Sequence, residues 1–177
     1  MPGQAPVIET ERLILREFRV SDLDDSAALW GDQEVTRFIG GRPQTREEVW
    51  PRILRYIGHW AALGYGFWVI EEKATGRYLG EIGLADFKRA LEPSFGDSPE
   101  AGWALSPAAH GKGYASEALT AVLAWGDARF GAGARTVCMI SIDNAASVKV
   151  AEKAGFSPFA YASYRDDPVI LFERTAA

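Results

Sequence analysis

Residues 100–130 constrain the fold of this chain more than any other stretch. An apolar run that ends at Leu105 leads into a short loop with two glycines, and from Tyr114 the apolar residues recur at helical spacing. The helical pattern stops at Gly131, a residue type that readily ends helices. The pattern therefore predicts a strand, a glycine loop and a long helix in direct succession.

The loop of this unit is suited to an anion. Because Gly111 and Gly113 lack side chains, the backbone N–H groups from His110 to Ala115 would be open to a ligand at the positive end of the helix dipole. Phosphate is the commonest biological anion at such a place. A tight connection without a ligand is the alternative interpretation. The usual dinucleotide and P-loop glycine patterns are both absent.

Length and composition indicate one domain over residues 1–177, because 177 residues with 47% hydrophobic content can bury a full core. The net charge of -5 argues against nucleic-acid binding. Cys138 is the single cysteine and lies in an apolar run, so we expect a buried thiol and no intramolecular disulfide. The N-terminus has no signal pattern, and no apolar run approaches the roughly 20 residues of a membrane span. We therefore expect a cytoplasmic protein without membrane contact.

The remaining patterns predict an α/β sheet with helices on both faces. Residues 35–41 resemble a loop, residues 88–99 a mobile excursion, and Pro51 should kink or break its helix. The expected strands are residues 11–19, 67–71, 78–87, 100–105, 135–142, 159–164 and 169–173, and the expected helices are residues 21–30, 45–63, 114–130 and 144–154.

Two segments resemble a known family. The run His110-Gly111-Lys112-Gly113-Tyr114-Ala115 resembles the acetyl-CoA pyrophosphate loop of the GNAT superfamily of N-acetyltransferases, whose pattern is Arg/Gln-x-x-Gly-x-Gly/Ala. Gly113 and Ala115 match, whereas His110 stands where Arg or Gln is usual. Residues 144–156 are similar to the N-x-x-S and E-K-x-G-F pattern of the RimJ/RimL-like branch, which acetylates ribosomal-protein N-termini. Residues 11–16 and 79–84 also resemble that branch, and the likeness extends from about residue 7 to residue 172.

The resemblance implies a fold and a cofactor. In the family a mixed sheet of seven strands splays between its fourth and fifth strands, and the pantetheine arm of acetyl-CoA pairs with the fourth strand. Carried over, the main chain of Gly102, Trp103 and Leu105 would bind the pantetheine, and the six residues from His110 to Ala115 would bind the pyrophosphate. No metal is implied.

The acid of the reaction is left open. Asn144 and Ser147 lie one helical turn apart and face the same side. The resemblance implies that Asn144 binds the cofactor arm and that Ser147 protonates the departing thiolate. Alternatively, both are helix-cap residues. Many family members carry a tyrosine acid in this helix, but the matching position here is Ala151, so water is also a candidate.

The base is open as well. Acetyl transfer needs a neutral amine, and an α-amine, with a pKa of about 7.7 to 8.0, asks less of a base than a lysine amine at about 10.4. Glu100, which matches the E-x-G pattern of the family, is the first candidate, and Glu81 is the second. His59 and water are further candidates. The alternative for Glu100 is a solvated carboxylate or one that orients a loop.

These features predict an acetyl-CoA-dependent N-acetyltransferase in which a primary amine attacks directly, without a covalent enzyme intermediate. We expect the acceptor to be a protein N-terminal α-amine. A small amine, such as an antibiotic or a polyamine, is an alternative that the acidity of the chain weakly favours. A non-catalytic acyl-CoA-binding module and a phosphate-binding enzyme of unrelated chemistry are two rival functions for the same residues. The sequence leaves open whether the chain is a monomer or a homodimer.

Overall fold

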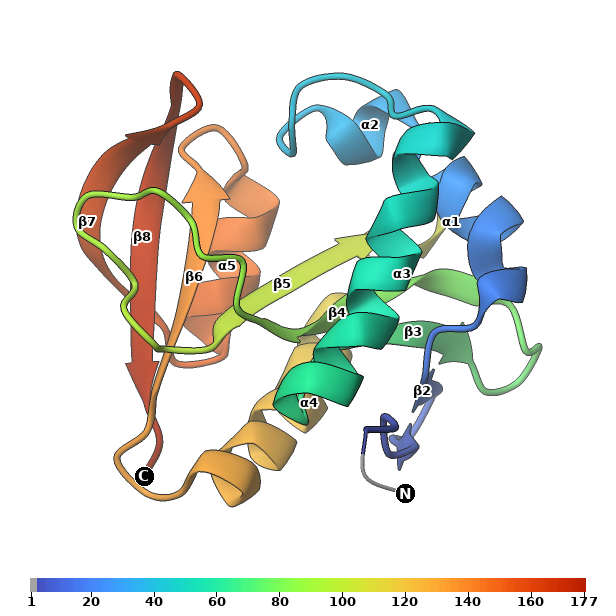
Figure 1. Cartoon of the computed structure of the whole chain (residues 1–177), viewed down its shortest axis with the longest axis horizontal. Coiled ribbons are helices and arrows are strands. Elements are labelled where there is room, and N and C mark those ends of the chain that lie inside the picture. Colours follow the sequence, from blue (N-terminus) through green and yellow to red (C-terminus); the bar gives the residue numbers. More distant parts are fainter. Residues whose placement is uncertain (1–2) are drawn as a thin grey trace.

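One eight-stranded sheet runs through residues 3–177, which are the residues that the computed structural model describes (Figure 1). The strand order is β1-β2-β3-β4-β5-β6-β8-β7, and every neighbouring pair is antiparallel except the parallel pair β5 and β6. The strands are β1 Ile8–Glu9, β2 Leu13–Arg16, β3 Phe67–Glu72, β4 Tyr78–Ala85, β5 Glu100–Leu105, β6 Arg135–Ser141, β7 Ser157–Tyr164 and β8 Asp167–Thr175.

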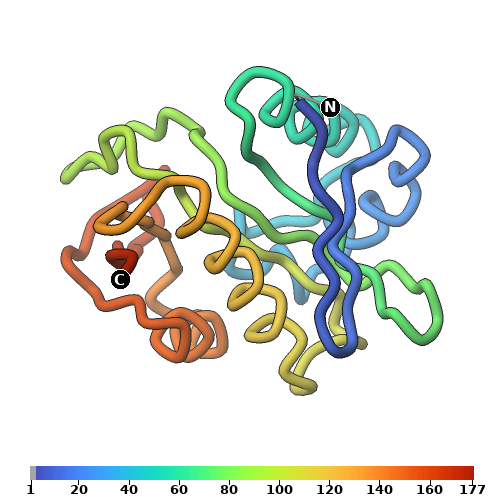
Figure 2. The backbone as a smooth tube through the Cα atoms, turned by 90° about the horizontal axis from the view of Figure 1, so that it is seen from below, coloured from blue at the N-terminus to red at the C-terminus, as the bar shows by residue number. Residues whose placement is uncertain are grey.

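Helices cover both faces of the sheet, and Figure 2 shows α3 and α4 on opposite sides of the strands. Side chains alternate along β4: Ile82 and Leu84 pack in the same core as α4, whereas Ala85 packs in the core that contains α3. Within residues 3–177, no helix is long and apolar enough to cross a bilayer. The helices are α1 Leu23–Trp30, α2 Gln33–Thr36, α3 Arg46–Leu63, α4 Tyr114–Phe130 and α5 Ala145–Lys153, and the two 3-10 turns are Val20–Asp22 and Pro107–Ala109.

The sheet parts between β5 and β6. These strands are paired at one position only, Glu100 with Val137, whereas β5 is paired with β4 along its whole length. Residues 101–105 therefore have no partner strand on the β6 side. Figure 1 shows the strands on the two sides of this parting, with β1 to β5 and α3 on one side and β6 to β8 with α5 on the other. The strands expected at residues 100–105 and 135–142, the fourth and fifth of the expected seven, correspond to β5 and β6. The splay predicted between them is confirmed.

Three local expectations are wrong. The sheet has eight strands instead of seven, because the two-residue β1 is too short to produce a periodic pattern. Residues 33–36 form the short helix α2, whose start is capped where the Asp32 side chain accepts a 2.8 Å hydrogen bond from Glu34 N. The helix α3 runs unbroken through Pro51, because the buried stripe that includes Val49 and Ile53 holds it against the sheet.

Residues 88–99, expected to be a mobile excursion, are anchored to the sheet. Leu91 and Phe95 are buried against Val137 of β6 and against Val169 and Leu171 of β8. The segment begins after β4 and ends at β5, yet it packs on the far half of the sheet, where Figure 1 shows it crossing in front of β6 to β8. It therefore joins the two halves on either side of the parting.

Candidate active site

The glycine loop leaves the N-terminal end of α4 open. Gly111 and Gly113 adopt left-handed φ angles of 72° and 79°, and Gly113 is the N-cap of α4 without a side-chain cap. None of the backbone N–H groups from Gly111 to Ser116 makes a well-formed hydrogen bond to another described residue. A Cβ atom placed on Gly111 would meet nothing within 4 Å. Unpaired N–H donors at the positive end of a helix dipole are suited to an anion, which is the ligand expected here from the sequence.

Arg12 holds this loop in place. No such role for Arg12 follows from the sequence, although residues 11–16 resemble the family. Its Nε donates to Glu117 Oε2 at 2.7 Å, and its NH1 group donates to Lys112 O at 2.8 Å. Its guanidinium carbon lies 4.4 Å from the centre of the Tyr114 ring. Arg12 precedes β2 and lies 100 positions before Lys112, so no local pattern could have revealed the contact.

In the predicted loop, residues 110–115, most side chains are engaged elsewhere or lack polar groups, so the main chain is the part exposed to a ligand. His110 Nε2 lies 2.8 Å from Leu105 O, which ties the ring to the end of β5. The Tyr114 ring is buried, and its hydroxyl donates to Glu72 Oε1 at 2.7 Å. The Lys112 side chain is exposed, and Ala115 is half-buried. A ligand here would therefore meet backbone N–H groups, with Lys112 as the nearby cationic side chain.

The first turn of α5 also has backbone N–H groups without an intrahelical partner, and here Asn144 caps the helix. The side chain of Asn144 caps the helix by accepting a 3.2 Å hydrogen bond from Ser147 N. Its amide nitrogen and the hydroxyl of Ser147 make no hydrogen bond to any residue of the described chain, and both residues are half-buried. Ala151, where the family usually has tyrosine, is fully buried. Asn144 therefore acts as a helix cap, as the alternative interpretation expects. Its amide nitrogen and the Ser147 hydroxyl remain available to a ligand.

Glu100 is held in a buried ion pair. Arg89 Nε lies 2.8 Å from Oε1 and 2.7 Å from Oε2 of Glu100, which is 6% exposed. Burial raises the pKa of the Glu100 carboxyl, and the Arg89 charge opposes that rise. The carboxylate therefore lies beside the parting, as predicted, but one guanidinium group already engages it and links it to residues 88–99.

The two other candidate bases are also engaged. Glu81 is fully buried, and its Oε1 accepts a 2.6 Å hydrogen bond from the Tyr56 hydroxyl. Burial raises the pKa of the Glu81 carboxyl, with the charge of Arg52 opposing the rise. The ring nitrogens of His59 lie 2.9 Å from Arg55 O and 3.1 Å from Asp86 O. Glu81 Oε2 has no hydrogen-bond partner in the described chain but is buried, and both ring nitrogens of His59 lie against main-chain oxygens.

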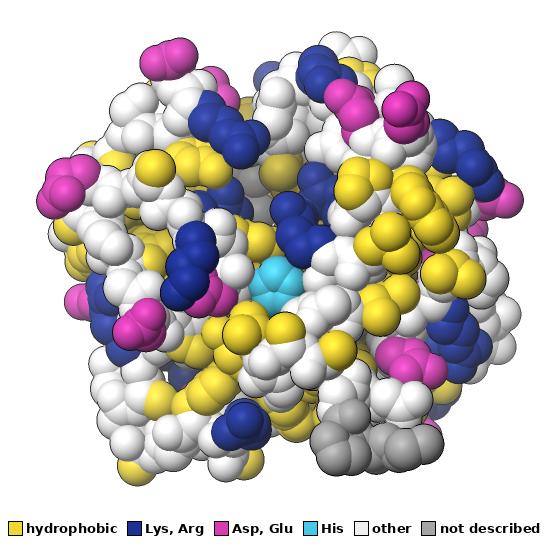
Figure 3. Space-filling view, viewed as in Figure 1, with side chains coloured by type: hydrophobic (Ala, Val, Ile, Leu, Met, Phe, Trp, Pro, Cys, Tyr) yellow, Lys and Arg dark blue, Asp and Glu magenta, His cyan; other side chains and the backbone are white. Residues whose placement is uncertain are grey.

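Two arginines lie against the Phe87 ring, Arg55 from α3 and Arg89 from the segment that also contacts Tyr164 of β7. The guanidinium carbons of Arg55 and Arg89 lie 4.7 Å and 4.9 Å from the centre of the Phe87 ring, and that of Arg89 lies 5.0 Å from the Tyr164 ring. These contacts and the ion pair of Arg89 with Glu100 join Arg55, Phe87, Arg89, Glu100 and Tyr164 into one cluster, and we call the space beside this cluster the central hollow. Figure 3 shows this face hollowed between its two halves, with Lys and Arg side chains gathered there. Its residues come from separate segments, so no sequence pattern revealed it.

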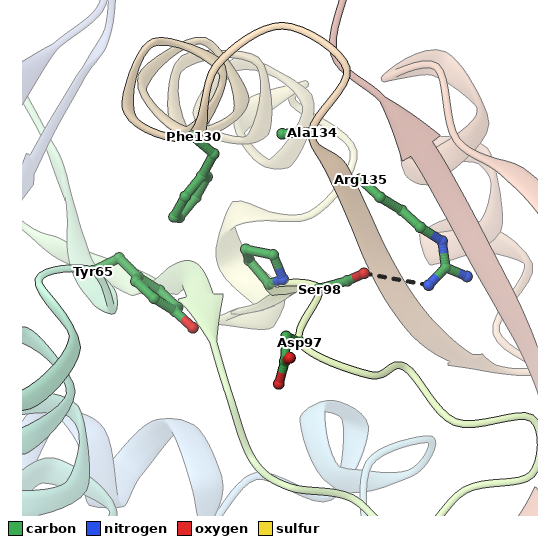
Figure 4. Close-up of a pocket in the computed structure, with 7 residues that line it drawn as sticks. Tyr65, Asp97, Ser98, Phe130, Ala134 and Arg135 are labelled. Carbon is green, nitrogen blue, oxygen red and sulfur yellow. Dashed lines mark hydrogen bonds between the residues drawn. The ribbon is translucent and has the colours of Figure 1, made fainter.

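A further pocket lies at the opposite end of β5 from the glycine loop (Figure 4). Ser98 Oγ accepts a 3.3 Å hydrogen bond from Arg135 NH1, and the rings of Tyr65 and Phe130 meet edge to face at 5.3 Å. This pocket therefore lies away from the open N–H groups of α4. Its lining residues are Tyr65, Asp97, Ser98, Pro99, Phe130, Ala134 and Arg135.

Comparison with known proteins defines the class. The acetyltransferase (GNAT) domain family matches residues 12–157. The chain belongs to this family and is an acetyl-CoA-dependent acyltransferase. The uncharacterized N-acetyltransferase YoaA of Bacillus subtilis (strain 168) is 29% identical over 152 residues, which cover 85% of this chain and 82% of that protein. A solved putative GNAT-family acetyltransferase from Bordetella pertussis is 30% identical, with a TM-score of 0.85 over 97% of this chain and 100% of that one.

More distant structures share the fold. One is a RimL ribosomal L7/L12 alpha-N-protein acetyltransferase in complex with coenzyme A, with a TM-score of 0.77 at 20% identity over 97% of this chain and 98% of that one. Another is a spermidine N-acetyltransferase from Vibrio cholerae in complex with coenzyme A and spermine, with a TM-score of 0.73 at 17% identity over 94% of this chain and 96% of that one. The fold is therefore common to enzymes with different acceptors.

The site fits acetyl-CoA. The open N–H groups at α4 suit the pyrophosphate, and the unpaired edge of β5 suits an extended arm that carries amide groups. Among residues 3–177, no group of three or more His, Cys, Asp or Glu residues is placed to hold a metal ion.

Proposed function

We propose that this protein transfers the acetyl group of acetyl-CoA to a primary amine, and that the amine is the α-amine of a peptide or protein N-terminus. The observation that carries this proposal is the ion pair of Glu100, whose carboxylate Arg89 Nε contacts at both oxygens. Burial raises the pKa of this carboxyl, but Arg89 already occupies both of its oxygens, so Glu100 gives limited help in deprotonating a strongly basic amine. An acceptor with a low pKa is therefore favoured, and an α-amine, at about 7.7 to 8.0, is partly neutral near pH 7.5.

Each end of the cofactor has a proposed set of contacts. The N–H groups of residues 111–116 hold the pyrophosphate, with Lys112 adding charge at its entrance. The main chain of Trp103 and Leu105 on the open edge of β5 binds the pantetheine arm, and the amide nitrogen of Asn144 donates to it. When bound, acetyl-CoA supplies an acetyl group activated as a thioester.

Two residues of the chain would handle the protons. Glu100 receives the proton that the amine loses as its nitrogen bonds to the acetyl carbon, directly or through a water molecule. The carbon–sulfur bond breaks, and the hydroxyl of Ser147 gives a proton to the leaving sulfur and regains one from solvent. The free hydroxyl of Ser147 and the burial of Ala151 support this assignment, because the usual tyrosine is absent.

The charge near the parting favours an N-terminal amine over a polyamine. A polyamine carries several positive charges, whereas Arg55 and Arg89 border the central hollow and Glu100 is already neutralised. Repulsion between like charges would weaken polyamine binding.

Release of coenzyme A thiol with a panel of amines tests the proposal. We expect turnover with peptides that have a free N-terminus, acetylation of the α-amine by mass spectrometry, and no turnover when the same peptides are blocked at the N-terminus. Turnover with spermidine or an aminoglycoside but not with peptides would contradict the α-amine assignment. Tight coenzyme A binding without turnover on any amine would indicate a binding module.

A further inference from the structure

We propose that the acceptor carries a carboxylate close to its reacting amine, and that Arg55 and Arg89 bind this carboxylate in the central hollow. The inference rests on the proposed function, because it specifies the acceptor of that same site. The carboxylate would be an acidic side chain in the first few residues of a peptide, or the α-carboxylate of a free amino acid. Both sources present the same planar anion to a guanidinium group.

The two terminal nitrogens of Arg89 are not used in its ion pair with Glu100. Only its Nε contacts Glu100, and its two terminal nitrogens form no ion pair with a second carboxylate in residues 3–177. The guanidinium is nevertheless fixed, since it lies between the rings of Phe87 and Tyr164, at 4.9 Å and 5.0 Å. A guanidinium held in place with free donors is prepared for an anion without further loss of side-chain entropy.

Arg55 has no ion-pair partner within the described chain. It is exposed on α3, and its guanidinium carbon lies 4.7 Å from the Phe87 ring. Phe87 therefore has one guanidinium from α3 and one from the segment after β4 against the same ring. The Arg55 guanidinium also lies 5.5 Å from the centre of the Tyr56 ring, and none of its N–H groups donates a hydrogen bond within the described chain, so its donors remain available.

The charge balance of the hollow is positive in a chain that is negative overall. Arg89 and Glu100 neutralise each other, and the nearby carboxylate of Asp86 is paired with Lys88 at 2.7 Å. Arg55 is left as an uncompensated cation, although the chain as a whole carries a net charge of -5. A cation that the rest of the hollow does not neutralise favours an anionic ligand over a neutral or cationic one.

Three peptides that differ at one position test the inference. They begin Ala-Glu, Ala-Gln and Ala-Lys, share the rest of their sequence and are amidated at the C-terminus, and free glutamate and glutamine form a second arm. For the wild type we expect kcat/KM to be about tenfold higher for Ala-Glu than for Ala-Gln, the effect of one charge-assisted hydrogen bond, and lowest for Ala-Lys.

Variants on one helix locate the effect. Arg55→Gln should remove most of the preference for Ala-Glu, Arg55→Lys should keep part of it, and Arg55→Glu should favour Ala-Lys. Arg46→Gln is the matched control, because Arg46 is also exposed on α3 but pairs with Asp24 at 2.8 Å, outside the hollow. The control should keep the full preference, and circular dichroism should show that every variant is folded.

The outcomes separate this inference from the proposed function. Equal kcat/KM for Ala-Glu and Ala-Gln, or a preference that Arg55→Gln leaves unchanged, would overturn the inference while the α-amine assignment stands. Acetylation of free glutamate alone would support the inference and overturn the peptide assignment. If no amine is acetylated, binding of fluorescent peptides to the protein saturated with coenzyme A decides: selective binding of Ala-Glu that is lost in Arg55→Gln supports the inference, and equal binding overturns it.

Discussion

Glu81 shows how a single residue that looks catalytic in the sequence can serve the core instead. Its carboxyl group is fully buried beneath α3, where the Tyr56 hydroxyl donates to it at 2.6 Å. Burial raises the pKa of this carboxyl, with the charge of Arg52 opposing the rise. The sequence could identify Glu81 as an acidic residue in an apolar strand, but its depth follows from α3, which packs over β4 from a different part of the chain.

Replacing Glu81 with Gln tests the raised pKa. The native state holds this proton more tightly than the unfolded state, so the contribution of Glu81 to stability is greatest below its unfolded pKa and is lost as pH rises towards its folded pKa. The amide of Glu81→Gln still accepts the Tyr56 hydroxyl but does not ionise. We therefore expect the unfolding free energy of the variant, relative to wild type, to rise as pH increases above the ordinary glutamate pKa of about 4.3 in urea titrations. If the difference in unfolding free energy between variant and wild type is constant or falls with pH, burial does not raise the pKa of the Glu81 carboxyl.

The element on which the proposed cofactor binding depends is the N-terminal end of α4. Within the described chain, α2, α3 and α5 each begin at a side-chain cap: Asp32 caps α2, Thr45 and Glu48 form a capping box at α3, and Asn144 caps α5. At α4 the cap is Gly113, which has no side chain to satisfy the first N–H groups. The difference follows directly from the amino-acid sequence, because the capping residues lie within three positions of the groups they bind. This is why the sequence alone could place the capped starts of α3 and α5 and the uncapped start of α4, although it missed the short helix α2 that Asp32 caps.

A pair of glycine substitutions tests whether the open end binds coenzyme A. Gly113 and Gly133 both have left-handed φ angles, 79° and 76°, so Ala at either position costs about 1 to 2 kcal/mol of stability. Only Gly113→Ala also places a Cβ atom 3.4 Å from the guanidinium of Arg12, which holds the loop. We expect calorimetry to show coenzyme A binding at least about tenfold weaker in Gly113→Ala and unchanged in Gly133→Ala. If the two variants bind coenzyme A with equal affinity, the loop is not part of the binding site.

At the scale of the whole molecule, the site forms where two half-sheets part. The strand and helix that flank the glycine loop are adjacent in sequence, so they and the splay could be predicted from local patterns and family resemblance. The ion pair of Arg89 with Glu100 and the stacking of Arg55 on Phe87 depend on the path of residues 88–99 and on the placement of α3. Such contacts are set by packing between distant segments, which a single sequence does not encode in any local pattern. The arginines of the proposed acceptor side are accordingly the residues that the sequence did not indicate.

Amide chemical-shift mapping with coenzyme A is the most direct test of the central claim that the open end of α4 and the free edge of β5 together hold the cofactor. We predict that titration of the isotope-labelled protein with coenzyme A moves the backbone amide signals of residues 111–116 and 101–105 most, and leaves the pocket around Tyr65 and Phe130 unaffected. Saturable shifts confined to other parts of the chain, or no shifts at millimolar coenzyme A, would contradict the account.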